Sequence, residues 1–359
     1  MRAALYTAKN HPLTIEKLDP LPPGRRDVVI QVGASGVCHT DVSVAKGWLP
    51  VPPPCILGHE GAGTVLEVGS QVTRVKPGDR VVACSTAGCG DCWYCVHDQG
   101  ELCEEMFALG FNPRVTRSDG SQAPAFAGLG TFADIMTVNE VCAIPVETDL
   151  PDEQLALIGC GVTTGVGAAL NTARVVAGSS VAVIGCGGVG QSVIQGARIA
   201  GAARIFAVDP VELKRKAAEQ QGATDLIDPT EGDPAVQIKA LTGGRGADYA
   251  FEVLGRPDTM TNAIDAARRG GTVVIVGMPK WDDRIELSAF QLFYDSKRLL
   301  GCVAGSAQVR RDVPRLVGLA ETGRLDLNAL ITRRIKLDGV NDAFRAMEAG
   351  EVIRSVILP

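Results

Sequence analysis

Four cysteines stand close together in the chain, separated by two, two and seven residues. Thiolates bind zinc, and four of them at such short spacing can surround a tetrahedral Zn²⁺ with no position left for a substrate. The spacing therefore predicts a structural zinc site formed by Cys89, Cys92, Cys95 and Cys103. Redox or iron–sulfur use of the same thiols is the rival interpretation. A zinc ribbon that binds nucleic acid is a third, and the lack of a Lys/Arg cluster around the motif weighs against it.

A glycine-rich turn at 185–190 follows an apolar stretch at 181–184 and precedes an apolar helical segment. Its pattern is G-x-G-x-x-G, in which glycines allow a tight turn and the close approach of a pyrophosphate to the N-terminus of the helix. Asp209 stands 24 positions after Gly185, where an acid accepts hydrogen bonds from the adenosine ribose and repels a 2′-phosphate. We therefore expect NAD rather than NADP, with a purely structural glycine turn as the alternative. The expected cofactor contacts here are Gly185, Gly187, Gly188, Val189, Gly190, Asp209 and Lys214.

Three further residues of metal-binding type remain outside the cysteine cluster. They are Cys38, His59 and Cys160, each in a glycine-rich local context that permits tight turns. Their distance in sequence does not tell whether they meet in the fold. From composition alone, a second metal site competes with three ordinary buried residues, because a free cysteine is often only a small core residue.

The elements that must position these residues differ between two parts of the chain. Up to about residue 140, short β segments alternate with Gly/Pro turns, which favours an irregular β-rich domain. Thr40 or Asp41 is expected to cap a short helix that runs to Lys46. From Val181, strands alternate with helices, which predicts a parallel, doubly wound α/β sheet. The strands expected in this part are 181–185, 203–208, 225–227, 247–253, 272–276 and 298–303, and the helices are 189–200, 211–221, 234–241 and 257–268.

Length and composition limit the function classes. A chain of 359 residues with 46% hydrophobic residues is long enough for two domains with separate cores. A net charge of −6 argues against a nucleic-acid partner and against an anionic membrane surface. The start of the chain lacks a signal pattern and no long apolar run is evident, so we expect a cytoplasmic protein. In that compartment, eleven cysteines favour metal binding over disulfides.

The chain resembles zinc-dependent alcohol dehydrogenases of the medium-chain dehydrogenase/reductase family over essentially its whole length. The motifs that carry the resemblance are G-V-C-H-T-D at 36–41, G-H-E-G-A-G at 58–63 and G-C-G-V-T-T-G at 159–165, together with the four-cysteine segment 89–103 and the glycine turn 185–190. Within the family, it is most similar to the class III type and to thiol-dependent formaldehyde dehydrogenases.

This resemblance implies a fold, a reaction and two cofactors. The expected fold is a β-rich GroES-like catalytic domain, residues 1–160 and 304–359 with a structural-zinc lobe at 88–104, plus a Rossmann NAD-binding domain at 161–303. The expected reaction is the reversible oxidation of a small alcohol to an aldehyde or ketone, with NAD and two Zn²⁺ per chain. The alternative is a thiol-dependent formaldehyde dehydrogenase that oxidises an S-hydroxymethyl thiol adduct.

The resemblance also implies a role for individual side chains. Cys38, His59 and Cys160 would hold a catalytic zinc. Thr40 would take the alcohol proton, Asp41 would hydrogen-bond the zinc-binding histidine, and Glu60 would lie behind the metal. The pyrophosphate would contact His39 and Arg354, the nicotinamide carboxamide would contact Val276, Cys302 and Val303, and the substrate pocket would be lined by Trp48, Leu49, Ser85 and Phe126.

Three further expectations concern the proton path, the substrate and self-association. Many family members have a histidine where this chain has Ser43, so the relay must pass through Ser43, water or His39. Arg114 and Arg117 would either belong to a solvated polar loop at 112–125 or bind a carboxylate-bearing thiol adduct. The family usually forms dimers or tetramers, and Phe290, Leu292, Phe293 and Tyr294 are candidates for a subunit contact.

Overall fold

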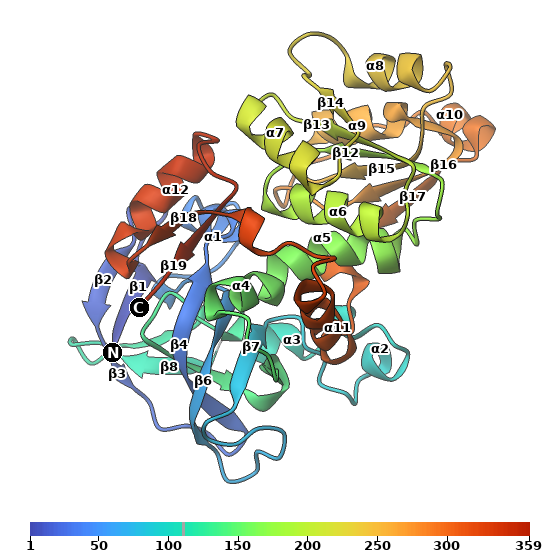
Figure 1. Cartoon of the computed structure of the whole chain (residues 1–359). Coiled ribbons are helices and arrows are strands. Elements are labelled where there is room, and N and C mark those ends of the chain that lie inside the picture. Colours follow the sequence, from blue (N-terminus) through green and yellow to red (C-terminus); the bar gives the residue numbers. More distant parts are fainter. Residues whose placement is uncertain (110–111) are drawn as a thin grey trace. The chain divides into compact units, whose positions relative to one another are not determined.

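The structure is a computed structural model that describes residues 1–109 and 112–359 of the chain. It divides into two compact units (Figure 1). The first comprises Met1–Gly161, Gln308–Gly323 and Leu330–Pro359, and the second comprises Val162–Ala307 and Arg324–Ala329. The sequence-based division placed 304–307 and 324–329 with the first part instead. These short segments pack with the second unit, and hydropathy cannot show which core a connecting segment joins.

The first unit is rich in β structure, and its main sheet has the strand order β11-β7-β6-β4-β19-β18, with β10 paired to β4. Smaller sheets have the orders β2-β1-β5 and β3-β8-β9. Its strands are β1 (Arg2–Tyr6), β2 (Thr14–Lys17), β3 (Asp19–Pro20), β4 (Asp27–Gly36), β5 (Cys55–Ile56), β6 (Glu60–Val68), β7 (Arg80–Cys84), β8 (Pro113–Thr116), β9 (Gln122–Pro124), β10 (Ile135–Asn139), β11 (Ala143–Pro145), β18 (Ile331–Ile335) and β19 (Arg354–Ile357). Its helices are α1 (His39–Ala45), α2 (Trp93–Val96), α3 (Met106–Leu109), α4 (Asp152–Leu157), α11 (Val309–Glu321) and α12 (Val340–Glu348).

Strand β4 pairs with β6, β10 and β19, and its apolar residues alternate. Val28, Ile30 and Val32 point to the core, as the two-residue period of a strand requires. Its partner β6 begins at Glu60, within the glycine-rich segment 58–63. Glycine allows this close pairing, since a Cβ at Gly63 would lie 1.9 Å from the Gln31 carbonyl oxygen.

The polar segment 112–125 is not the surface loop that the sequence suggested. It contains the antiparallel strands β8 and β9, and β8 also pairs with β3. The expected cap of helix α1 was wrong as well, because Cys38 occupies the N-cap position and the helix begins at His39. Turn-rich composition concealed a hairpin in the first case. In the second, the helix begins at least two residues earlier than Thr40 and Asp41 had indicated.

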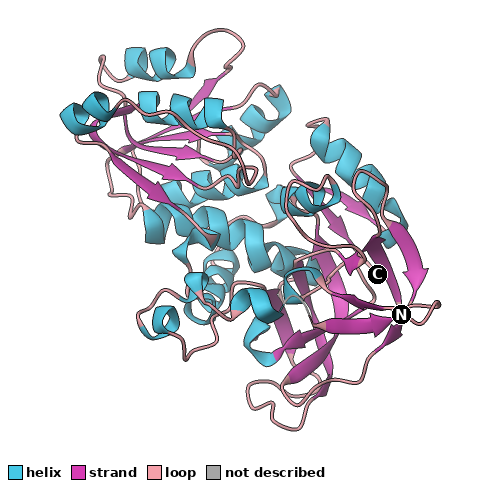
Figure 2. Ribbon diagram, turned by 180° about the vertical axis from the view of Figure 1, so that it is seen from behind, coloured by secondary structure: helices cyan, strands magenta, loops and turns pink. Residues whose placement is uncertain are grey.

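The second unit is a parallel sheet of strand order β14-β13-β12-β15-β16-β17, which confirms the predicted doubly wound fold (Figure 2). The order reverses between β12 and β15, which creates the switch point where such sheets bind ligands. Its strands are β12 (Ser180–Ile184), β13 (Arg204–Val208), β14 (Asp225–Ile227), β15 (Ala247–Glu252), β16 (Ala267–Ile275) and β17 (Arg298–Gly301). Its helices are α5 (Thr163–Gly167), α6 (Gly188–Ile199), α7 (Glu212–Gln221), α8 (Pro234–Leu241), α9 (Pro257–Ala266) and α10 (Ala289–Asp295).

Alternate residues of these strands serve two separate cores. Val181 and Val183 of β12 pack in a cluster with Ile194 of α6, on one face of the sheet. Ala182 of β12 packs on the other face with residues such as Ile238 of α8. Strands that are apolar on both sides read as continuous hydrophobic runs. This explains why they were predictable from sequence.

Residues Asp152–Thr172 form a helix that passes a length and composition test for crossing a membrane, and 78% of its most apolar window is buried. Burial of this kind is typical of a core helix. The sequence had shown no long apolar run because small and polar residues interrupt this segment.

Candidate metal and dinucleotide sites

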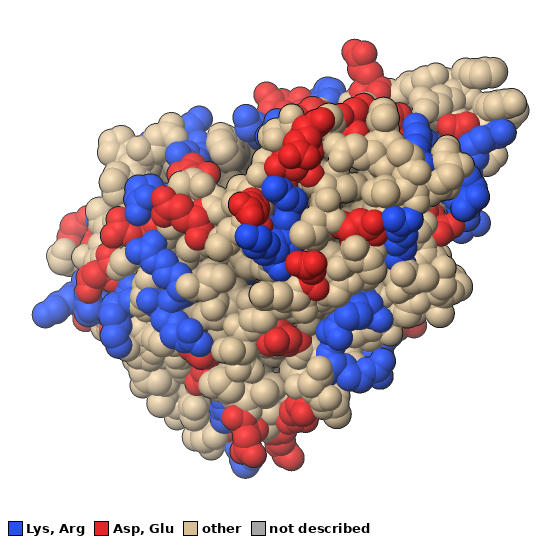
Figure 3. Space-filling model, turned by 45° about the horizontal axis from the view of Figure 1, so that its top comes forward, with Lys and Arg blue, Asp and Glu red and all other residues tan. Residues whose placement is uncertain are grey.

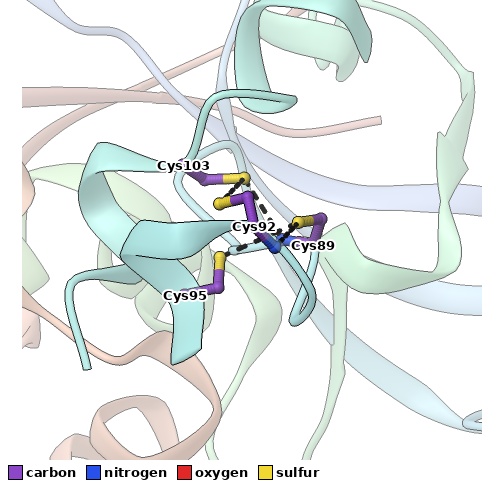
Figure 4. Close-up of side chains that lie close together, drawn as sticks. All are labelled: Cys89, Cys92, Cys95 and Cys103. Carbon is purple, nitrogen blue, oxygen red and sulfur yellow. Dashed lines mark hydrogen bonds between the residues drawn. The ribbon is translucent and has the colours of Figure 1, made fainter. Parts of the chain in front are cut away.

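The four clustered cysteines meet in the first unit (Figure 4). Their ligand atoms all lie within 4.8 Å of one another, and the Sγ atoms of Cys89 and Cys95 are 3.9 Å apart. The backbone N–H of Cys92 donates to the Cys89 sulfur at 3.3 Å, and the N–H of Cys89 donates to the Cys103 sulfur at 3.3 Å. Backbone donors, first that of Cys95, lower the pKa of the Cys92 thiol to about 7. Four sulfurs with donors already directed at them fit a closed tetrahedral metal site.

A second group of ligand atoms lies elsewhere in the same unit. One atom each from Cys38, His59, Glu60 and Cys160 fall within 4.8 Å of one another. Cys38 precedes helix α1, His59 and Glu60 stand at the start of β6, and Cys160 lies in the helical turn Ile158–Val162. Three separate segments therefore deliver two thiols and one imidazole to the same place.

His59 has one nitrogen reserved for a ligand. Its Nε2 is buried and has no hydrogen-bond partner among the described residues. A buried polar atom without a partner is costly, and a metal ion at this position would satisfy it. Both Glu60 oxygens already have partners, Arg354 and the Gly161 N–H, so the ligands left are two thiolates and an imidazole. Such a Cys₂His set leaves the fourth position of a tetrahedral zinc open. The donor set thus fits a catalytic zinc.

Asp41 controls the orientation of this histidine. Its Oδ1 lies 3.1 Å from His59 Nδ1 and accepts a hydrogen bond from the Gly58 N–H at 2.9 Å. Burial alone would lower the pKa of His59, but the charges of Asp41 and Cys38 raise it to about 10. A hydrogen bond from Cys160, followed by the charge of His59, holds the pKa of Cys38 well below its usual range. The group is therefore built to keep a thiolate at Cys38.

Glu60 and Arg354 form a buried ion pair directly beside these residues. Arg354 Nη2 contacts Glu60 Oε2, while Glu60 Oε1 accepts a hydrogen bond from the Gly161 N–H at 3.1 Å. Only 5% of Arg354 is exposed, and its guanidinium is held by Glu60 beside the metal-binding group. The pyrophosphate contact expected of Arg354 stays a prediction.

Helix α1 carries the residues assigned to proton transfer and to one phosphate contact. Thr40 is half-buried, and its Oγ1 lies 3.7 Å from Cys38 Sγ. His39 is exposed at the first position of the helix. Ser43 is buried, and its hydroxyl donates to the His39 carbonyl oxygen at 3.1 Å. The Ser43 proton is thus used inside the helix.

The residues assigned to the substrate pocket are only partly brought together. The Phe126 ring stands edge-on to His59, with ring centroids 5.5 Å apart. Phe126 and Leu49 are half-buried against one apolar cluster. Trp48 is exposed, and Ser85 is half-buried immediately after β7. Phe126 is the member placed directly at the metal group.

Neither Arg114 nor Arg117 is the solvated side chain that the sequence suggested. Arg114 is buried and pairs with Asp27 at 2.7 Å. Arg117 donates two hydrogen bonds to Glu16, both at 3.1 Å. Because each guanidinium already faces a carboxylate, these arginines hold the β3-β8-β9 region to its neighbours.

The glycine turn of the second unit joins β12 to α6. Gly185 has a φ of +98°, a conformation that favours glycine. A Cβ at Gly190 would lie 1.9 Å from the Gly185 carbonyl oxygen, whereas one at Gly187 would meet open space. Gly187 is the N-cap of α6, with Gly188 and Val189 in the first turn. Free N–H groups at an open helix N-terminus fit a pyrophosphate.

Asp209 follows β13 and fastens this turn. Its Oδ2 accepts from the Cys186 N–H and its Oδ1 from the Val211 N–H, both at 2.9 Å. Each carboxylate oxygen has a further lone pair, so a ribose hydroxyl can still donate to it. Lys214 lies on α7, and its carbonyl accepts from the Gln191 side chain at 2.9 Å.

The residues assigned to the nicotinamide lie at the carboxyl ends of neighbouring strands. The Val276 N–H donates to the Glu252 carbonyl at 2.8 Å, immediately after β16. The Cys302 N–H donates to the Ile275 carbonyl at 2.9 Å, and Val303 is next in the chain. The sheet thus brings Val276, Cys302 and Val303 to one edge.

The sequence-based prediction missed Glu252, a fully buried carboxylate at the end of β15. Its Oε1 accepts hydrogen bonds from the Leu254 and Gly255 N–H groups, and burial raises its pKa. Leu254 in turn packs over Gly185, whose added Cβ would lie 2.8 Å from the Leu254 side chain. The signal in the sequence that could have identified Glu252 is an acidic residue at the end of an apolar strand.

Comparison with known proteins finds two family models, one in each half of the chain. The zinc-binding dehydrogenase family model matches residues 188–322, and the alcohol dehydrogenase GroES-like domain model matches residues 24–148. The chain is 40% identical to an S-(hydroxymethyl)glutathione dehydrogenase of Photobacterium damsela subsp. piscicida, over 99% of each chain.

Solved structures are similar over the whole length. An alcohol dehydrogenase zinc-binding domain protein from Burkholderia ambifaria has a TM-score of 0.95 at 35% identity, covering 100% of this chain and 98% of the other. Benzyl alcohol dehydrogenase from Acinetobacter calcoaceticus has a TM-score of 0.93 at 32% identity, covering 99% and 98%. A zinc-binding dehydrogenase from Sinorhizobium meliloti 1021, bound to NADP, has a TM-score of 0.84 at 28% identity, covering 100% and 99%.

Proposed function

The chain belongs to the zinc-dependent alcohol dehydrogenase family of oxidoreductases, and we propose that it oxidises uncharged, apolar alcohols with NAD as the hydride acceptor. The observation that carries this proposal is the group of Cys38, His59 and Cys160, with the buried Nε2 of His59 left for a ligand. The relatives and the donor set agree on zinc. The substrate class and the choice of NAD rest on this chain's own side chains.

The residues around the metal group have separate tasks in this proposal. A zinc ion held by Cys38, His59 and Cys160 would supply Lewis-acid polarisation of the substrate oxygen, and NAD would accept the hydride. Asp41 keeps the His59 ring oriented with Nε2 toward the ligand position. Thr40 takes the alcohol proton, and the Glu60–Arg354 pair supports the cluster from behind.

The choice of an uncharged substrate follows from the side chains that are free to meet it. Phe126 presents an apolar ring beside His59, with Leu49 in the same apolar cluster. A glutathione adduct carries carboxylates, and Arg114 and Arg117, the cations suggested for them, already pair with acids. We therefore rank apolar alcohols first. Oxidation of an S-hydroxymethyl thiol adduct is the second candidate, because a relative with 40% identity is named for that substrate.

NAD is favoured over NADP by the position of Asp209. Its carboxylate is fixed beside the glycine turn by two backbone N–H groups and would repel a 2′-phosphate. Arg215, on the helix that follows, is paired with Asp228 at 2.8 Å. The Sinorhizobium meliloti structure is bound to NADP, so the two cofactors must be compared directly.

We also propose a cytoplasmic homo-oligomer that binds neither nucleic acid nor membranes. Basic and acidic side chains are interspersed on the face shown in Figure 3, without a large patch of one sign. A net charge of −6 points the same way. Both metal groups need reduced thiols, which a cytoplasm maintains. Exposed apolar residues on α10 are the candidate subunit contact.

The test compares substrates at equal enzyme concentration while NADH formation is followed. Benzyl alcohol and linear primary alcohols are compared with formaldehyde plus glutathione, and NAD with NADP. We expect turnover of the free alcohols with NAD, and no gain from thiol. Turnover that requires both formaldehyde and thiol would overturn the ranking in favour of the adduct. A preference for NADP would show that Asp209 does not select the cofactor. In that case Asp209→Ala should leave the ratio of activities with NAD and NADP unchanged.

A further inference from the structure

The segment after Val303 has an unusual backbone. Ala304, Gly305 and Ser306 have φ values of +48°, +72° and +47°, so three successive residues are left-handed. A residue with a Cβ loses about 1–2 kcal/mol in this conformation, and two of the three carry one. Such strain persists only where the surroundings hold it, and it gathers at functional sites. This left-handed turn therefore needs an explanation from its contacts.

Helix α5 and the turn behind it hold the middle of the left-handed turn. A Cβ at Gly305 would lie 2.3 Å from the Thr163 carbonyl oxygen, and one at Gly167 would lie 2.5 Å from the Gly305 carbonyl oxygen. The two backbones thus touch directly. Asn171 adds a hydrogen bond from its Nδ2 to the Gly305 carbonyl at 3.2 Å.

Thr172 ties together the two ends of the same turn. Its Oγ1 lies 2.8 Å from the Ser306 Oγ and donates to the Cys302 sulfur at 3.3 Å. A hydroxyl has one proton, so Ser306 must donate to Thr172 when Thr172 donates to Cys302. The resulting chain runs from Ser306 through Thr172 to Cys302. Cys302 is also fixed to β16, by its N–H to the Ile275 carbonyl at 2.9 Å.

We propose that Thr172 is a positioning residue for the nicotinamide end of the dinucleotide, an inference that rests on the proposed NAD-dependent function. Through its two hydroxyl contacts it holds the left-handed turn, and the turn sets the backbone of Cys302 and Val303. Val303 is 48% exposed at the carboxyl edge of the parallel sheet, where open α/β sheets bind ligands. A loosened turn would cost nicotinamide affinity and leave the adenosine end unaffected.

The experiment measures two ligands on the full-length, zinc-loaded protein. NADH carries the nicotinamide, and ADP-ribose shares the adenosine and pyrophosphate but lacks it. Thr172→Val removes the hydroxyl at nearly constant volume, and Thr172→Ser restores it. Thr242→Val is the matched control, because Thr242 is half-buried in the same unit and its hydroxyl also has hydrogen-bond partners. It donates to the Ile238 and Lys239 carbonyls at 2.7 and 3.1 Å and accepts from the Gly246 N–H at 2.8 Å.

We expect Thr172→Val to weaken NADH binding about tenfold while ADP-ribose binding changes less than about twofold. Thr172→Ser and Thr242→Val should both stay near the wild type for both ligands. Ser306→Ala should also weaken NADH binding. Adding it to Thr172→Val should cost little more, because the Ser306 hydroxyl acts through Thr172.

Two results would overturn the inference. The first is equal weakening of NADH and ADP-ribose by Thr172→Val, which would assign Thr172 to general folding. The second is unchanged NADH affinity in that variant. Wild-type protein that bound neither ligand would instead overturn the proposed function, and with it the need for a positioning residue.

Discussion

Cys160 is the metal-group residue farthest in sequence from its partners, and its removal separates the two metal sites. Cys160→Ser takes one of two thiolates from the open site and leaves Cys89, Cys92, Cys95 and Cys103 intact. We expect the zinc content to fall from two ions to one per chain, and kcat/KM to fall at least about 1000-fold, since a Lewis acid supplies several kcal/mol. Elemental analysis together with initial rates measures both.

The control for this variant is Cys142→Ala, which removes a buried cysteine outside both groups. Burial raises the pKa of the Cys142 thiol to about 12, so it is an inert packing residue. The control should keep two zinc ions and its activity. Two zinc ions and full activity in Cys160→Ser would mean that Cys38 and His59 are enough to hold the second zinc ion and to support catalysis.

Ser43 provides a second prediction at the residue scale. Because its hydroxyl is buried and donates to the His39 carbonyl, we propose that the proton leaves Thr40 through water rather than through Ser43. Added buffer base should then raise the turnover of the wild type about tenfold, less than the roughly 100- to 10,000-fold effect of a positioned general base, because a base from solution is not held in place. Ser43→His supplies a titratable relay and should lose this dependence.

Ser43→Ala separates the alternatives, because it removes the hydroxyl without adding a base. It should behave like the wild type in buffer response and in solvent isotope effect. Loss of turnover in Ser43→Ala would assign the proton to Ser43 itself. An unchanged pH profile in Ser43→His would also contradict the water path.

The sequence could predict which residues meet in the second metal-binding group but not what holds them there. Cys38, His59 and Cys160 were identifiable because motifs of known type surround them. Glu252 and Thr172 were not, because their importance arises from hydrogen bonds to backbone groups and side chains that only the folded chain brings near. The expectation that Arg114 lies in a solvated loop failed for the same reason, since its partner Asp27 is 87 residues away in the chain.

At the scale of elements, an ion pair joins the edge strand β14 to its neighbour β13. Arg204 of β13 donates two hydrogen bonds to Asp225, at 2.7 and 2.9 Å, in the pair that aligns β14 with β13. The Arg204 hydrogen bonds lower the pKa of Asp225 below its usual 3.8. A lowered folded-state pKa means that the pair stabilises the fold above about pH 4 and that this contribution is lost as the pH falls through the lowered pKa.

Asp225→Asn should therefore lower stability by about 1 kcal/mol at pH 7, a modest value because the pair is partly exposed. The difference from the wild type should close as the pH falls below about 4. Urea unfolding midpoints between pH 7 and pH 3 measure it, with the exposed Asp282→Asn as control. A difference that stayed constant with pH would exclude the ion pair as its source.

Elements were predictable where one physical signal dominated. The strands of the parallel sheet are apolar on both faces and separated by amphipathic helices, so their existence and order along the chain followed from sequence. The sequence did not predict the β8–β9 hairpin or β18, because these segments carry many polar side chains of their own. Their pairing with β3 and β19 depends on neighbours remote in sequence.

At the scale of the molecule, chain order conceals which segments form one core. The first unit is assembled from three stretches of sequence, and its last strand, β19, pairs with β4 some 320 residues earlier. A return of the chain to the first unit was foreseeable from the change in pattern after residue 304. The placement of Arg324–Ala329 in the second unit was not foreseeable. It depends on specific hydrogen bonds, such as the one from the Gln195 side chain to the Asp326 carbonyl at 3.0 Å.

The second unit has an exposed apolar surface on helix α10. Helix α10 has no buried residue, and its Phe290 and Phe293 are 72% and 80% exposed. The helix directly precedes β17, which lies at the end of the strand order and pairs with β16 alone among the described strands. An open edge strand beside exposed aromatic rings is a surface that proteins normally cover by association. We therefore expect a homodimer through α10 and β17.

Phe290→Asp combined with Phe293→Asp should weaken this dimer at least about 100-fold, because central aromatic residues contribute about 2 kcal/mol or more each to an interface. Light scattering coupled to size-exclusion chromatography at micromolar concentration should show wild-type dimers and monomers of the variant. Val236→Asp, which places a charge on the exposed face of α8 in the same unit, should remain dimeric. Since each unit has its own core, the monomeric variant should keep its two zinc ions. A variant that stayed dimeric would move the contact to another face, and a monomeric wild type would show that the apolar face of α10 remains open in solution.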